Sequence, residues 1–117
     1  MAVLRIDIVE LPEAPLDAAT EFYSQELPEI RDDSDRLPDH DLVLVFEPAS
    51  HEHRAWRLAA VQGLARELAP RRVNALASRD DAAIAAALAY LNAAGGVTGQ
   101  YLQLDDLGAG LVISSPA

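Results

Sequence analysis

The sequence predicts an α/β protein with a mostly parallel sheet of four or five strands and about three helices. Two observations carry this prediction. Segments with helical spacing of apolar residues alternate along the chain with short apolar segments of strand length, and this alternation is typical of parallel strands joined by crossover helices. One short segment, residues 42–46 (LVLVF), is apolar throughout, as expected for a central strand covered on both faces.

The composition indicates a single acidic domain. The 117 residues include nine arginines, no lysine and nineteen Asp or Glu, which give a net charge of −10. This length suits one domain, residues 1–117, but it is short for a complete dinucleotide-binding enzyme. A negative surface repels phosphate backbones and anionic lipids, so neither a nucleic acid nor a membrane is expected as a partner.

The sequence also favours a cytoplasmic protein. It contains no cysteine, and therefore neither disulfides nor thiolate chemistry. Residues 1–10 carry charged side chains where a signal peptide would have an apolar block. No apolar run approaches the length of a membrane span.

Two elements are expected before the central strand. Residues 3–9 alternate between apolar and charged side chains, which predicts a strand at a sheet edge, because one of its faces is charged. Asp17 is a suitable N-cap for a short helix over residues 18–27. Pro28 is expected to end that helix.

A solvent loop is expected between this helix and the central strand, over residues 28–41. A cation site is the alternative interpretation, but calcium loops place their acids at alternate positions around a glycine, and this segment contains no glycine. A solvated acidic loop is therefore predicted. Its aspartates are Asp32, Asp33, Asp35, Asp39 and Asp41.

Two helices and two strands are expected after the central strand. Pro70 ends the first helix, since proline cannot continue it, and Gly95 with Gly96 ends the second. A short extra strand at residues 111–113 is a candidate within the tail, residues 107–117. In order, the expected elements are helix 51–69, strand 72–77, helix 80–94 and strand 97–105.

Two motifs in this second half resemble a known family. Residues 67–70 (ELAP) followed by 72–75 (RVNA) are similar to the joint between the fifth helix and the sixth strand of short-chain dehydrogenases/reductases. Residues 97–100 (VTGQ) with 104–105 (LD) are similar to the last strand of that family. The resemblance implies a truncated Rossmann-like domain, which matches the C-terminal half of a reductase without its nucleotide-binding half.

The helix expected over residues 51–69 has two dissimilar faces. One face is apolar and is expected to pack on the sheet, whereas the other carries small residues that allow a second helix to approach closely. Because the resembled family joins its subunits through this helix, the second face predicts an interface; packing against the chain's own first helix is the alternative. The sheet face contains Leu58, Val61, Leu64 and Leu68, and the interface candidates are Ala55, Trp56, Ala59, Ala60 and Gly63.

Two devices that a reductase of the resembled family needs are absent from the sequence. A glycine-rich turn between strand and helix holds the pyrophosphate, but all six glycines lie at position 63 or later. A Tyr-x-x-x-Lys pair transfers the proton; counted back from Glu67, its two positions fall on Ser50 and Arg54, and the chain has no lysine. No catalytic residue, cofactor or metal is therefore expected.

These observations predict a non-catalytic subunit that dimerises, either with itself or as the partner or scaffold of a full-length ketoreductase. The alternative is a small enzyme or ligand-binding protein with a pocket near Ser50, His51, His53 and Arg54. In that alternative, Arg54 and Arg57 could hold an anionic substrate. A separate interpretation is that His51 and His53 bind one zinc ion together with an acid, but structural zinc usually needs four well-spaced ligands, so no metal is expected.

Overall fold

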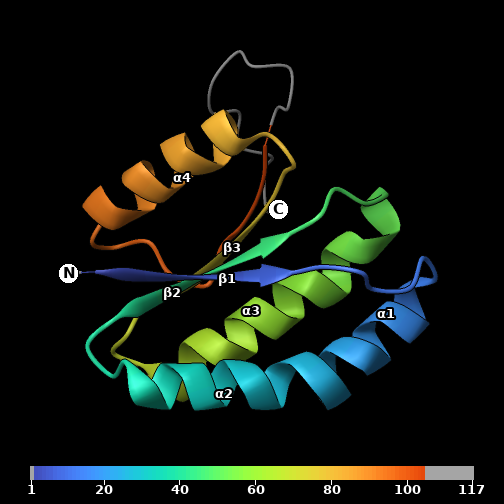
Figure 1. Ribbon diagram of the computed structural model, residues 1–117, viewed down its shortest axis with the longest axis horizontal. Helices are drawn as coiled ribbons and strands as arrows, with labels where there is room; N and C mark the ends of the chain where they lie inside the picture. Colours follow the sequence, from blue (N-terminus) through green and yellow to red (C-terminus); the bar gives the residue numbers. More distant parts are fainter. Residues whose placement is uncertain (1, 105–117) are drawn as a thin grey trace.

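The computed structural model describes residues 2–104 and contains one sheet of four parallel strands in the order β1-β2-β3-β4 (Figure 1). The predicted α/β, Rossmann-like arrangement is therefore confirmed. The elements are β1 (Val3–Ile8), α1 (Pro15–Glu21), the π-helical turn η1 (Phe22–Glu26), α2 (Leu27–Arg36), β2 (Asp41–Phe46), the 3₁₀ turn η2 (His51–His53), α3 (Arg54–Leu68), β3 (Val73–Ala77), α4 (Asp81–Ala93) and β4 (Tyr101–Gln103).

The strands lie where their patterns predict. Every residue of β2 and β3 is buried, as the apolar run of β2 requires of a central strand. β1 forms one edge of the sheet, and its charged residues Arg5 and Asp7 are exposed. β4, at the other edge, is shorter than the predicted strand 97–105, because residues 97–100 are irregular and the chain bends at Gly99, which has a φ of 73°.

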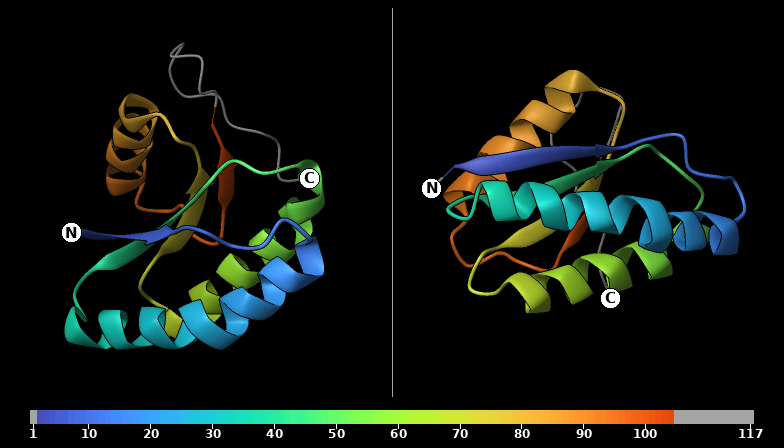
Figure 2. Two further views of the ribbon diagram at one scale, coloured as in Figure 1. Left: turned by 45° about the vertical axis from the view of Figure 1, so that its right-hand side comes forward. Right: turned by 60° about the horizontal axis from the view of Figure 1, so that its bottom comes forward.

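Helices cover both faces of the sheet (Figure 2). The α1–α2 run and α3 lie side by side on one face, and α4 lies on the other. The apolar face predicted for α3 is confirmed: Val61 and Leu64 are buried, and Leu58 and Leu68 pack against the same core. The larger core also contains the aromatic side chains of Phe22, Phe46 and Tyr101.

The solvent loop predicted over residues 28–41 is wrong for residues 28–36, which belong to α2. α1, η1 and α2 follow one another without a break, so Pro28 lies in the first turn of α2 instead of ending a helix. The π-helical turn before it explains this, because a locally widened hydrogen-bond ladder can accommodate a residue that has no N–H. Ile30 and Ser34, one turn apart, are the buried residues of α2, and Asp41 is buried at the start of β2.

The start of the first helix also differs from the prediction. α1 begins at Pro15, with Ala14 in the N-cap position, instead of after Asp17. Proline suits the first helical position, because its fixed φ is compatible with a helix and its absent N–H would have no partner there. The candidate strand at residues 111–113, the rest of the tail and residue 105 lie outside the described residues.

Candidate functional site

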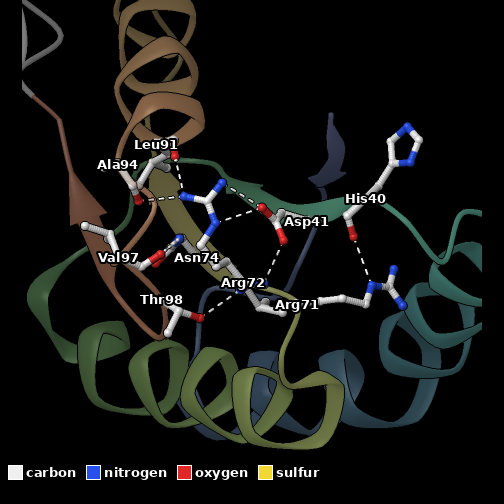
Figure 3. Close-up of polar contacts among 10 residues, drawn as sticks. His40, Asp41, Arg71, Arg72, Asn74, Leu91, Ala94, Val97 and Thr98 are labelled. Atoms are coloured by element: carbon white, nitrogen blue, oxygen red, sulfur yellow. Dashed lines mark hydrogen bonds and ion pairs between the residues drawn. The ribbon is translucent and has the colours of Figure 1, made fainter. Parts of the chain in front are cut away.

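Arg72 joins three elements at the amino end of the sheet (Figure 3). Its guanidinium forms an ion pair with Asp41, the first residue of β2, at 2.7 Å from Nη2 to Oδ2. The backbone N–H of Arg72 donates to the other carboxylate oxygen of Asp41 (2.8 Å). Nη1 donates to the carbonyls of Leu91 and Ala94 at the end of α4. One largely buried arginine, with 14% of its side chain exposed, thus connects β2, β3 and α4.

Arg71 forms similar hydrogen bonds at the end of α2. Its Nε donates to the carbonyl of His40 (2.9 Å), as Figure 3 shows. Its Nη2 donates to the carbonyls of Ser34 and Leu37, each at 3.1 Å. These acceptors lie at the end of α2, where carbonyl groups have no partner within the helix. The two adjacent arginines therefore satisfy the ends of helices on opposite faces of the sheet.

The RVNA and VTGQ motifs are bonded to each other. The Asn74 side chain donates to the carbonyl of Val97 (3.0 Å) and accepts from the backbone N–H of Gln100 (3.1 Å). The backbone N–H of Val73 donates to the Thr98 hydroxyl (3.0 Å). The motifs that carry the family resemblance therefore fix the path of the chain into β4 at the amino end of the sheet.

A cavity of about 460 Å³ lies at the opposite end of the sheet. It is formed by the loops that follow β1 and β2, by the first turn of α3 and by Arg79, which follows β3. The carboxyl ends of parallel strands are the usual position of ligand sites in α/β proteins. Its lining residues are Ile8, Leu11, Pro12, Glu13, Glu47, Pro48, Ala49, Ser50, His53, Arg57 and Arg79.

The structure brings two of the four predicted pocket residues to this cavity. Ser50 and His53 line it; Ser50 occupies the N-cap position of η2 without a side-chain capping bond. His51 is exposed and does not line the cavity. Arg54, in the first turn of α3, also lies outside the lining, and its guanidinium carbon is 6.0 Å from the centre of the Tyr101 ring.

Both ring nitrogens of His53 have partners. The indole N–H of Trp56 donates to Nδ1 (3.1 Å), and Nε2 lies 2.8 Å from the carbonyl oxygen of Glu13. Because indole is only a donor, Nδ1 is the acceptor and Nε2 carries the proton that the carbonyl accepts. His53 is buried and has no nitrogen left for a metal. Residues 2–104 contain no group of three His, Cys, Asp or Glu side chains that could hold a metal ion.

Arg57 is a buried cation in the cavity wall, with only 4% of its surface exposed. Its Nη1 donates to the carbonyl of Glu47 (2.9 Å) and to the hydroxyl of Tyr101 (3.0 Å). The guanidinium lies over the Phe46 ring, at 4.5 Å from the ring centre. Within residues 2–104 no carboxylate forms an ion pair with it. The sequence places Arg57 near the start of a helix but gives no sign of this burial.

The interface candidates on α3 divide into two groups. Trp56 packs against Phe22 within the core, and Ala60 is buried there. Part of the small-residue face is thus covered by the chain's own first helix, which was the alternative to an interface. Ala55 and Ala59 are exposed and Gly63 is half-buried.

A shallow groove of about 170 Å³ lies beside these small residues, between α3 and the η1–α2 segment. Arg31 and Glu67 form a half-exposed ion pair at its edge, with 2.7 Å between Nη2 and Oε1. The hydrogen bond from Arg31 lowers the pKa of the Glu67 carboxyl below its ordinary value. This pair connects α2 to α3 at the surface, where such contacts contribute little stability.

The chain was compared with protein families, curated proteins and solved structures. A family model described as "SDR-like: Short chain dehydrogenase-like protein" matches residues 6–104. No curated protein and no solved structure matches the chain. None of the helices within residues 2–104 combines the length and the apolar content that crossing a membrane requires.

Proposed function

We propose a function from one premise: this chain belongs to the short chain dehydrogenase-like (SDR-like) family. The proposed function is that of a non-catalytic reductase-like subunit, which acts by associating with a second copy of itself or with a full-length ketoreductase. The two parts of this proposal, the lack of reductase chemistry and the association, rest on separate observations.

The absence of reductase chemistry is supported by the residues around the cavity. The positions of the proton-transferring pair hold Ser50 and Arg54, and Ser50 lies ahead of the helix that would carry a tyrosine. A serine hydroxyl is a far weaker acid than a tyrosine hydroxyl, and arginine does not replace the compact ammonium of lysine. The loops after β1 and β2, residues 9–14 and 47–50, contain no glycine with which the backbone could approach a pyrophosphate.

Association is supported by the accessible part of α3. Ala55 and Ala59 are exposed, and a Cβ atom added at Gly63 would have no atom within 4 Å among the residues described. Gly63 costs roughly 1 kcal/mol relative to alanine inside a helix, and no close contact within the described part of the chain accounts for it. A helix of another subunit that packs along these three residues would account for it. This small-residue surface is the observation on which the proposal rests.

Replacing Ala59 by arginine is expected to weaken self-association about tenfold or more, because the new side chain would occupy the centre of the proposed interface. Light scattering after size-exclusion chromatography would measure the molar mass over a dilution series. Ala85→Arg is the matched control, since Ala85 is also an exposed alanine, on α4. A parent chain that is monomeric throughout the series, or an equal effect of the two substitutions, would contradict the proposal.

Ligand binding is a second candidate function, and the cavity at the carboxyl end of the sheet favours it. Ser50 and His53 reach this cavity, together with the buried Arg57. The walls are held in place by two contacts: the backbone N–H of Glu10 donates to the Glu47 carboxylate (3.0 Å), and His53 bonds the loop after β1.

A further inference from the structure

We propose that the cavity at the carboxyl ends of β1 and β2 binds a small organic carboxylate, and that Arg57 holds the carboxylate group. This site does not depend on the association of subunits. It also requires no proton transfer by Ser50 or Arg54.

One edge of the Arg57 guanidinium makes no hydrogen bond within residues 2–104. Both hydrogen bonds that the protein makes to this group use Nη1. Nε is buried without a hydrogen-bond partner among residues 2–104, and Nη2 forms no hydrogen bond to them. Nε–H and an Nη2–H lie along the same edge of the planar group, so together they match the two oxygens of a carboxylate.

The charge of Arg57 is incompletely compensated within the described part of the chain. The Phe46 ring and the Glu47 carbonyl offer the negative face of a π-system and a dipole, which stabilise a cation less than an opposite charge does. Burying a charge without such a partner is costly. A bound carboxylate would supply the counter-ion.

The surrounding backbone also favours an anion. α3 begins beside the cavity, and the N–H groups of a helix start carry partial positive charge. The first turn of α3 contains no acidic residue, although Glu52 lies in the η2 turn directly before it, and Ser50 makes no side-chain capping bond to the N–H groups that follow it. These features add to the field of Arg57 and do not replace it.

The remaining lining residues select the body of the ligand. Ile8, Leu11 and Pro12 offer apolar surface to an organic chain. Glu13 and Glu47 line the same cavity, and their charges disfavour a dianion such as phosphate relative to a monoanion. The volume of about 460 Å³ lies within the range of small-molecule sites. The lining therefore fits a small monocarboxylate with an apolar body.

Titration with butyrate tests this site. The ¹⁵N-labelled protein is followed by the Nε–H signal of Arg57 and by the backbone amides of the cavity, with inorganic phosphate as a second probe. Butyrate is expected to shift the Arg57 Nε–H signal in a saturable way, and phosphate is expected to bind more weakly. The substitution Arg57→Gln, which retains N–H donors without the charge, is expected to weaken butyrate binding about tenfold or more.

Arg66→Gln is the matched control, because Arg66 is an exposed arginine on the same helix, and it is expected to leave butyrate binding unchanged. An Arg57 Nε–H signal that does not respond to butyrate in the parent protein would overturn the proposal, even if the Arg57→Gln variant fails to fold. Equal binding of butyrate by the parent and by Arg57→Gln would also overturn it. Tighter binding of phosphate than of butyrate would refute the monocarboxylate assignment. The titration can be carried out at a concentration at which the molar mass of the parent protein has been measured. A failure to bind butyrate would therefore not contradict the proposed association of subunits.

Discussion

Replacing Arg72 by alanine is expected to lower the free energy of unfolding by about 3–5 kcal/mol, the usual cost of removing one partner from a buried ion pair. Asp41 is 4% exposed and would lose the guanidinium with which it pairs. The carbonyls at the end of α4 would lose their donor as well. Equilibrium unfolding in urea, followed by circular dichroism, would measure the loss.

Arg36→Ala is the control for this experiment. Arg36 also pairs with an aspartate, Asp33, but 75% of its side chain is exposed. Exposed pairs of this kind contribute about 0–1 kcal/mol. A loss for Arg72→Ala no larger than that for Arg36→Ala would show that the amino-end network does not stabilise the sheet.

Replacing Phe22 by alanine is expected to cost about 3–5 kcal/mol of stability, as for other fully buried aromatic residues. Phe22 opens the π-helical turn, has no exposed surface, and contacts the rings of Phe46 and Trp56, with centroids 5.9 and 5.5 Å away. It therefore fixes the helical run to both β2 and α3. Thermal and urea unfolding would measure the effect.

The neighbouring Tyr23 provides the control, since it lies in the same turn but is 46% exposed. Tyr23→Ala is expected to cost less than about 1 kcal/mol, because little buried surface is lost. Similar losses for the two substitutions would mean that the π-helical turn is not held by the aromatic cluster.

The fold was predictable wherever one segment determines its own environment. The apolar run of β2 requires cover on both faces, and the charged face of β1 requires an edge. The π-helical turn was not predictable by the same reasoning, because Pro28 is a helix-ending signal unless the preceding turn widens to accommodate it. Once the helix continues, the spacing of Ile30 and Ser34 is sufficient to explain which side of α2 is buried.

The candidate site was predictable only in position. The polar segment after β2 places Ser50 and His53 at the carboxyl end of the sheet, where the cavity is. The burial of Arg57, on α3, depends on Phe46 and Tyr101, which come from β2 and β4. The pairing of Arg72 with Asp41 likewise joins residues 31 positions apart. Neither contact leaves a local pattern, and tertiary packing alone creates both.

The rate of NADPH oxidation in the presence of a small β-keto ester measures directly whether this reductase-like fold retains reductase chemistry. With Ser50 and Arg54 at the positions of the proton-transferring pair, we expect the same rate of NADPH oxidation with and without the protein. A rate that increases in proportion to the protein concentration, and that Arg54→Ala abolishes, would contradict it.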